Sequence, residues 1–480
     1  MFRYIKSILF TLTILAVVVN MSYAQNGKVL TLEQCIEMGL KNNSQFKIAA
    51  YQVDRAGANV KGSYSSVLPR ITSSFSSGRN TIGETTNLVN SQVFDEATVI
   101  DTDGNPITIS VPAVDPTTGQ FIIDRAERTS PTNSFWGHRF RLSYNQTLFD
   151  FGRSWNTIKQ AKASFNSSSQ DLTSARFTVY STVKERYFGF LKATKLEEEF
   201  RLAVGRGKDQ LSRTQSMFEI GSVAQIDVYR QEVILGTDEI NFIRQQNFVK
   251  IARANLNVVM GQDPETPIEI MDMSPDSRKL EINLEEAYEI AEKNNPGLKR
   301  FEYDMDAAEY GRKAAKGRYL PSIGVAITYS RDNEKLNRVY GDFNENFFVN
   351  IGAQVDFNIF NGLSDAAEVS RQSANYSIAN ENWVDQKRTL QLQVKQAHLN
   401  LRAFNEISDI NERNLRAAEE EYRLAHERYR VGAGTQLEVT EAQVSLTRAR
   451  VTLVSAKYDA LIAQAQLEAA MGTIEENQSN

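Results

Sequence analysis

The sequence predicts a mixed but mainly α-helical protein built from two tandem copies of one unit. The stretch 30–78 matches the stretch 282–330 without a gap at a constant offset of 252, which indicates a duplication. Two stretches without proline, 132–263 and 322–480, are long enough for helices of unusual length. After the opening helix of each copy, apolar and polar residues alternate with the period of a β-strand. Each copy should therefore combine a long helical hairpin with two strands.

The later parts of the two copies match at a different offset, 211, which pairs Phe149 with Phe360 and Gly221 with Gly432. The difference, 252 minus 211, gives the first copy 41 additional residues. These residues lie between Pro69 and Phe149. The second copy should therefore be the more compact version of the same unit.

The beginning of the chain, 1–24, predicts an export signal. Two cations precede an apolar run at 8–19, and small residues up to Ala24 mark a cleavage site, so the mature chain is expected to begin at Gln25. An uncleaved helical anchor is the alternative. The apolar run is too short to span a bilayer, which needs about 20 residues, so cleavage is favoured.

Charge and composition argue against several functions. The formal net charge is -5, and it becomes -7 when the two signal cations are removed, which disfavours nucleic acid as a partner. Cys35 is the only cysteine, so no internal disulfide is expected, and a small core residue on a helix is the favoured interpretation. His138, His398 and His426 form no metal-ligand cluster of usual spacing, and no nucleophile motif, phosphate loop or dinucleotide fingerprint is found. We therefore expect no enzyme activity, no cofactor and no metal.

The expected elements follow the duplication. The first copy, 25–261, should contain strands near 70–79 and 138–149 joined by a loop at 80–137, a long helix at 153–218, a tip at 219–225 and a return helix at 226–261. After a linker at 262–281, the second copy, 282–472, should contain strands near 322–331 and 347–360, a long helix at 364–430, a tip at 431–436 and a return helix at 437–472, before a tail at 473–480. Each long helix would extend on the order of 100 Å. Hairpins of this length must pack their apolar stripes on other helices in the manner of coiled coils.

The 41 additional residues fall in the loop between the first two strands. The stretch 79–135 is rich in Asn, Thr, Asp and Pro, as expected of a solvated loop. A small hairpin could pair 107–111 with 120–123 across a turn at 115–119. The alternating residues Asp101, Asp103 and Asn105 resemble the start of a calcium loop but lack its later ligands, so a plain Asp-Gly turn is favoured.

The strands predict contact with lipid. Apolar residues at 349–359 alternate with Asn, Gln, Asp and Gly, as in an outer-membrane barrel or in a half-buried soluble sheet. Strand length and export favour transmembrane strands. Four strands cannot close a barrel, and lipid does not tolerate an open edge. Two chains would give an eight-strand barrel filled by side chains, whereas three would give a 12-strand barrel with an aqueous lumen, so a conduit requires a homotrimer.

The duplicated motifs resemble the TolC-like outer-membrane efflux protein family over nearly the whole mature chain. The resemblance rests on paired asparagines in each opening helix, Leu-Pro before each first strand, Leu-Phe-Asp-Phe-Gly-Arg at 148–153, Ile-Phe-Asn-Gly at 359–362, and the glycine-centred tips. It implies four transmembrane β-strands per chain that trimerise into a 12-strand β-barrel continuous with a 12-helix periplasmic α-barrel. A mixed equatorial domain would draw on 25–43, 262–295 and the tail. Such proteins are passive exit ducts driven by an inner-membrane transporter, which they reach through a periplasmic adaptor protein.

The same resemblance assigns the tips to adaptor docking. The tip residues are small and nearly uncharged, which suits close approach by another helical hairpin. They are Gly221, Ser222, Val223, Ala224, Gly432, Ala433, Gly434 and Thr435. Their glycines must also end helices, which is the structural alternative.

Beside the second tip, Glu438 and Glu441 are three residues apart and share one helix face. The resemblance implies that they form acidic rings around a periplasmic aperture; a solvated helix face is the alternative. Asp227 and Tyr429 match two members of the family's aperture latch. Gly434 occupies the position of the latch arginine, so the charged latch should be absent or differently built.

The expected function is the outer-membrane exit duct of a tripartite efflux or type I secretion system. An exported trimeric coiled-coil tether and an unassisted diffusion porin are the alternatives. The alternation at 349–359 opposes the tether, and the long hairpins with small-residue tips oppose the porin. Nothing in the chain specifies the exported substrate, because selection would belong to the transporter.

Overall fold

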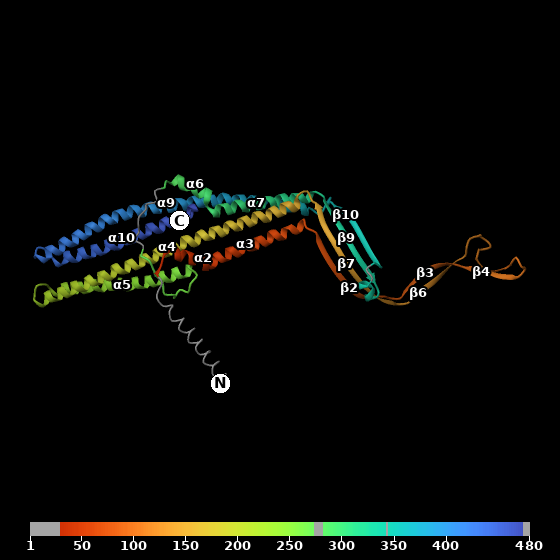
Figure 1. The fold of residues 1–480 in the computed structure, drawn as a ribbon, viewed down its shortest axis with the longest axis horizontal. Coiled ribbons are helices and arrows are strands. Elements are labelled where there is room, and N and C mark those ends of the chain that lie inside the picture. Colours follow the sequence, from red (N-terminus) through yellow and green to blue (C-terminus); the bar gives the residue numbers. More distant parts are fainter. Residues whose placement is uncertain (1–28, 273–281, 342–343, 474–480) are drawn as a thin grey trace, which may run out of the picture. The chain divides into compact units, whose positions relative to one another are not determined.

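The computed structural model describes residues 29–272, 282–341 and 344–473, which form two compact units (Figure 1). The helical unit comprises the described parts of 1–64, 153–318 and 360–480, and the β unit comprises 65–152 and 319–359. The expected signal at 1–24, part of the linker at 262–281 and most of the tail at 473–480 lie outside the described residues.

Four long helices dominate the helical unit. Helix α4 (Arg153–Glu219) and helix α9 (Ser364–Arg430) each have 67 residues, and each leads into a shorter return helix. The return helices are α5 (Gln225–Val259) and α10 (Gln436–Met471). At about 1.5 Å per residue, α4 and α9 each extend on the order of 100 Å. The unit is therefore built on two long helical hairpins, α4–α5 and α9–α10.

Short helices open each copy. They are α2 (Leu32–Asn42), α3 (Ser44–Ser63), α6 (Leu284–Asn294) and α7 (Pro296–Lys316), with one-turn 3₁₀ segments at Tyr64–Ser66 and Gly317–Tyr319. Thr31 and Gln34 form a capping box at the start of α2. The short strands β1 (Val29–Leu30) and β8 (Glu269–Ile270) pair in parallel.

The repeated asparagines lie beside the ends of the return helices, where Met260-Gly261 in the first copy matches Met471-Gly472 in the second at the offset of 211. The Asn43 side chain caps α3 and donates from Nδ2 to the Val259 carbonyl oxygen at 3.0 Å. Asn295 caps α7 and donates in the same way to Ala470 at 3.0 Å. We call these two junctions the equatorial locks: Asn42, Asn43, Val259 and Gly261 in the first copy, and Asn294, Asn295, Ala470 and Gly472 in the second. Each lock ties an opening helix to the end of a return helix.

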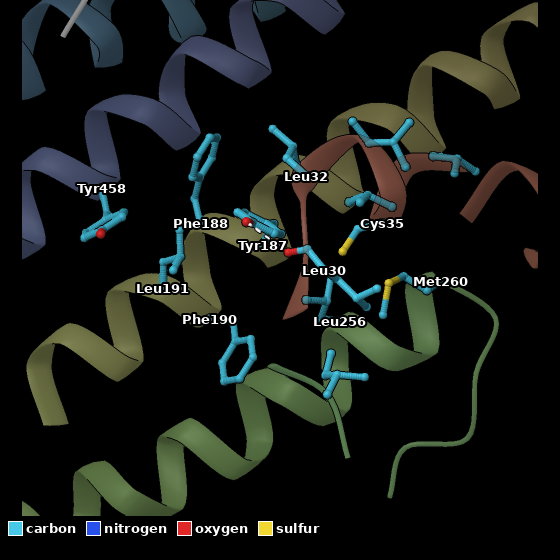
Figure 2. Packing of buried hydrophobic residues seen from close by; sticks show 14 residues of the cluster. Leu30, Leu32, Cys35, Tyr187, Phe188, Phe190, Leu191, Leu256, Met260 and Tyr458 are labelled. Atoms are coloured by element: carbon cyan, nitrogen blue, oxygen red, sulfur yellow. Dashed lines mark hydrogen bonds between the residues drawn. The ribbon is translucent and has the colours of Figure 1, made fainter. Parts of the chain in front are cut away.

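The first lock adjoins a hydrophobic core, shown in Figure 2. Tyr187, Leu256 and Met260 are fully buried there, and the Tyr187 hydroxyl donates to the Met271 carbonyl oxygen at 2.8 Å. Cys35 is also fully buried, which confirms it as a core residue. Burial raises the pKa of the Cys35 thiol to about 11, so the thiol stays neutral at physiological pH.

The β unit contains one four-stranded antiparallel sheet in the order β10-β9-β7-β2. Its strands are β2 (Arg70–Ile82), β7 (Asn133–Phe149), β9 (Ser322–Asn333) and β10 (Phe347–Asp356). The last strand is shorter than the predicted 347–360. It ends because Asp356 pairs with Ser322, the first residue of β9, and Pro321 precedes it.

The loop joining β2 and β7 forms two successive ribbons. Strand β3 (Thr85–Gln92) pairs with β6 (Ile123–Ser130), and β4 (Phe94–Ile100) pairs with β5 (Pro106–Pro112). The predicted pairing of 107–111 with 120–123 is therefore wrong. The tighter Asp-Gly turn after β4 takes 107–111 into its own hairpin. The turn at 115–119 is closed by the isolated bridge between Val114 and Phe121 and by the hydrogen bond from the Asp115 N–H to the Gln120 carbonyl oxygen at 2.8 Å.

The turn between β4 and β5 is a plain Asp-Gly turn, as predicted. The Asp101 carboxylate accepts hydrogen bonds from the backbone N–H groups of Asp103 at 2.8 Å and Asn105 at 2.9 Å. Gly104 adopts a φ of 86°, which favours glycine. The acidic side chain therefore stabilises the turn itself. One further short helix, α8 (Leu336–Tyr340), follows β9.

Among the described residues, no helix is both long and apolar enough to cross a membrane.

Candidate functional site at the helical tips

The two hairpins end in tips with the same backbone conformation. Gly221 and Gly432 both have a φ of 76°, in the left-handed region that favours glycine. The Ser222 N–H donates to the Met217 carbonyl oxygen at 2.8 Å, and the Ala433 N–H donates to that of Arg428 at 2.8 Å. These bonds satisfy carbonyls that would otherwise be unpaired at the end of each long helix.

The tips present an open surface. Ile220 and Val431 are 80% and 67% exposed, and a Cβ added at Gly221 or Gly432 would meet nothing within 4 Å. The glycines thus end the helices and also leave room for close approach by a partner. Docking of an adaptor at the predicted tip residues 221–224 and 432–435 remains a prediction.

The acidic residues near the tips have different partners. In the first tip, Asp227 pairs with Arg230 on the same helix at 3.0 Å. In the second tip, Glu438 lies 3.5 Å from the guanidinium of Arg428, which belongs to the preceding helix. Glu441 is exposed. The predicted ring residues Glu438 and Glu441 therefore differ, because only Glu438 has this cationic partner across the turn.

Tyr429 links the two tips. Its hydroxyl donates to the sulfur of Met217 at 3.0 Å, and its ring packs beside buried Val439 and Ala442. Burial, with a smaller contribution from the charge of Asp227, raises the pKa of Tyr429 above its ordinary value. The predicted latch residues therefore act separately here: Asp227 bonds to Arg230 and Tyr429 to Met217.

Gly434 occupies a crowded position. A Cβ there would lie 3.1 Å from Arg428 Cβ, 3.1 Å from the Tyr429 nitrogen and 3.2 Å from Glu438 Oε2. The backbone therefore has no room for an arginine at the latch position without rearrangement. Sequence reasoning missed Arg428. At the offset of 211 its counterpart in the first copy is the uncharged Met217, and this difference in charge beside the two tips was a signal that could have singled out Arg428.

Polar contacts join the two hairpins along α4 and α10. Lys184 binds Glu468 at 2.7 Å, Lys192 binds Asp459 at 2.8 Å, and Arg206 donates to Thr447 at 3.2 Å. The residue numbers of these contacts rise along α4 and fall along α10, so the two helices are antiparallel neighbours. Burial lowers the pKa of Arg206, which nevertheless remains charged. This seam fixes one hairpin against the other.

The β unit carries an exposed apolar face. Strand pairing places Ile71, Tyr144, Ile327 and Ile351 in one row across all four strands. The side chains of Ile71 and Ile351 are 66% and 71% exposed. On the opposite face, the adjacent row is polar and consists of Thr72, Ser143, Thr328 and Asn350. In the described part of the chain, β2 and β10 each have a strand on one side only.

No group of three or more His, Cys, Asp or Glu side chains within the described ranges could hold a metal ion. His398 lies near the Ile282 carbonyl oxygen at 2.9 Å, and His426 lies 3.3 Å from Arg213, so these two histidines have separate environments.

The comparisons with known proteins agree with one another. The sequence profile of the family described as outer membrane efflux protein matches residues 35–262 and 287–473. The chain is 25% identical over 259 residues to the outer membrane efflux protein BepC of Brucella suis biovar 1 (strain 1330); this match covers 53% of the chain and 54% of BepC. The chain thus aligns with about half the length of this curated relative.

Solved outer-membrane channels have a similar fold. CusC matches with a TM-score of 0.75 at 16% identity, covering 92% of each chain. VceC of Vibrio cholerae matches with a TM-score of 0.73 at 14% identity, covering 92% of this chain and 96% of VceC. CmeC of Campylobacter jejuni matches with a TM-score of 0.72 at 18% identity, covering 92% of this chain and 85% of CmeC.

Proposed function

The chain belongs to the outer membrane efflux protein family and resides in the outer membrane, and we propose that it is the passive exit duct of a tripartite efflux or type I secretion system. The family resemblance expected from the sequence motifs is confirmed. The family is one of channels rather than enzymes. The row Ile71, Tyr144, Ile327 and Ile351 carries the proposal, because an apolar row that runs across all four strands, exposed at its two ends and half-buried between them, suits lipid.

The length of β7 and its aromatic ends support a transmembrane sheet. Trp136 and Phe149, near the ends of the strand, are 52% and 51% exposed. At about 3.4 Å per residue and a tilt near 45°, the stretch between them spans roughly 30 Å, the thickness of a bilayer core. Aromatic residues at both interfaces are typical of membrane barrels.

The open edges at β2 and β10 support a homotrimer. Backbone groups at an edge cannot remain unpaired in lipid, so each sheet must join other copies. Three copies would make a 12-strand β-barrel wide enough for an aqueous lumen. The long hairpins α4–α5 and α9–α10 would supply a 12-helix tunnel through the periplasm, with Glu438 and Glu441 around its aperture.

The tips would receive a periplasmic adaptor protein, through which an inner-membrane transporter delivers the substrate. The small tip residues and the exposed Ile220 and Val431 support this role, because another hairpin could approach the backbone closely and bury both side chains. Selection and energy would come from the transporter, since the chain contributes a conduit.

Two measurements test this function. The purified trimer should produce discrete conductance steps in planar bilayers, and a cysteine placed at Ser222 or Ala433 should crosslink to a periplasmic protein in cells. A matched cysteine at Ser164, which is exposed on the body of α4, is the control for nonspecific crosslinking. A trimer without conductance would support a tether instead. Conductance with no tip-specific crosslink would support a diffusion porin.

A further inference from the structure

We propose that Arg428 sets the charge of the periplasmic aperture by neutralising Glu438, so that Glu441 carries the net negative charge of the ring. This inference rests on the proposed function and adds a residue that determines charge selectivity. Arg428 would act as an internal counterion, held by its own tip rather than by a neighbouring chain.

The contacts of Arg428 place it across the second tip. Its Nη2 donates to the Ala433 carbonyl oxygen at 3.0 Å, and its Nη1 lies 3.5 Å from Glu438 Oε2. Its own carbonyl oxygen accepts from the N–H groups of Ala433 at 2.8 Å and Gly434 at 3.1 Å. The backbone and the side chain of Arg428 therefore both hold the turn, and the guanidinium is directed toward the Glu438 carboxylate.

Gly434 makes this approach possible. The space that a Cβ at Gly434 would need is bounded by Arg428 Cβ at 3.1 Å and Glu438 Oε2 at 3.2 Å. The glycine therefore lets the two charged side chains meet over the turn. The glycine at the latch position and the arginine at position 428 therefore depend on each other, because a side chain at 434 would crowd the Arg428–Glu438 contact.

The first tip neutralises its acidic residue with a different partner. At the offset of 211, Asp227 and Arg230 correspond to Glu438 and Glu441, and Met217 corresponds to Arg428. The first tip pairs Asp227 with Arg230 on one helix. The second tip has an acid in place of that arginine and a cation on the preceding helix. A single surface ion pair contributes little to stability, so we expect the effect of Arg428 to lie in the electrostatic potential.

The charge balance gives the expected behaviour. Around a threefold axis, three Glu438–Arg428 pairs would be neutral and three Glu441 carboxylates would remain. Without the arginine, both rings would be negative. The aperture should then favour cations more strongly, because charges within a Debye length of about 10 Å at 0.1 M salt act on a passing ion.

The test is the reversal potential of single channels under a KCl gradient. Arg428→Gln should raise the ratio of K⁺ to Cl⁻ permeability roughly threefold, with trimer assembly unchanged. Arg402→Gln is the matched control: it removes an equal charge from the exposed Arg402–Glu406 pair at 3.0 Å on the same helix. Arg402 precedes Arg428 by 26 residues, which is roughly 39 Å along the helix and beyond the Debye length. This control should change the ratio much less.

Further variants keep the proposal testable. Arg428→Lys should stay near the wild-type ratio, and the double variant Arg428→Gln with Glu438→Gln should return toward it, because the net charge is then restored. Equal ratios for Arg428→Gln and Arg402→Gln, or no restoration in the double variant, would overturn the role of Arg428 and leave the duct intact. A wild-type trimer without conductance would overturn both.

Discussion

The two tips share one backbone and differ in their charges. Gly221 and Gly432 have the same φ, and the same bonds close the ends of the helices before them. In the first tip, Asp227 forms an ion pair with Arg230 on the same helix. In the second tip, both corresponding residues are acidic, and Glu438 pairs with Arg428 on the preceding helix. The geometry of the duplicated turn is therefore fixed by a glycine with positive φ and by the backbone hydrogen bonds that end the helix. The charges around it can change without altering the turn.

The equatorial locks show the opposite behaviour, since both copies retain the same contacts. Asn43 and Asn295 each cap a helix and bind the end of a return helix at 3.0 Å. Gly261 and Gly472 approach the asparagine backbone so closely that an added Cβ would lie 2.7 Å and 2.9 Å from it. Tight packing leaves no alternative at these junctions, whereas the exposed tips allow divergence.

The largest predicted effect tests this contrast. Gly261→Ala and Gly472→Ala should each lower the free energy of unfolding by about 2–5 kcal/mol, because each adds left-handed strain and a backbone clash. Chemical denaturation followed by circular dichroism would measure it. Gly236→Ala, in the interior of α5 where a Cβ meets nothing within 4 Å, is the control and should be neutral or slightly stabilising. Equal effects in all three variants would contradict the locks.

The next prediction converts the second tip into the first. Glu441→Arg should let this position pair with Glu438 as Arg230 pairs with Asp227, while Arg428 remains present. The aperture would then carry a net positive charge, and channel selectivity should change from cations toward anions. Reversal potentials under a KCl gradient would show the change. Glu421→Arg, on the exposed side of α9 away from the tip, should leave selectivity nearly unchanged.

Most of the helical unit could be predicted because its signals are local and duplicated. The absence of proline and the spacing of Gly221 and Gly432 led to expected long helices at 153–218 and 364–430, and the structure has them at Arg153–Glu219 and Ser364–Arg430. The paired asparagines and Met-Gly pairs were visible as motifs. Their meeting in the equatorial locks was not, because contacts between distant segments leave no local pattern.

The β unit was less predictable in its loop. The alternation at 349–359 predicted β10 up to 360, but the strand ends at Asp356, where its partner β9 begins. The partner of 107–111 depended on which of two turns, at Asp101 or at 115–119, would close the hairpin. In the structure the turn at Asp101 closes it, and 107–111 pairs with β4. At the tips, Arg428 was missed because its partners depend on side-chain geometry across a turn.

A smaller effect should distinguish the crowded tip position from its open counterpart. Gly434→Ala should destabilise the second turn by about 1 kcal/mol, because its Cβ would meet Arg428 and the Tyr429 backbone. The corresponding residue of the first tip is Val223, which already carries a larger side chain. Val223→Ala should change its turn by less than about 0.5 kcal/mol. Hydrogen exchange of the Ala433 and Ser222 amides would report the two turns, and equal changes would refute the difference in crowding.

The smallest effect concerns Tyr429, which joins the tips. Tyr429→Phe removes the hydroxyl bond to Met217 and should cost about 0.5 kcal/mol. Because the folded state raises the pKa of Tyr429, the neutral phenol is favoured, and its contribution is fully present below the ordinary tyrosine pKa near 10. It is lost as the pH rises through the higher folded-state value. Ultraviolet titration of the variant against the wild type should therefore lack one tyrosine that ionises above pH 10. A missing group that ionises at or below the ordinary value would show that the phenol is solvated and that the tips are not joined through Met217.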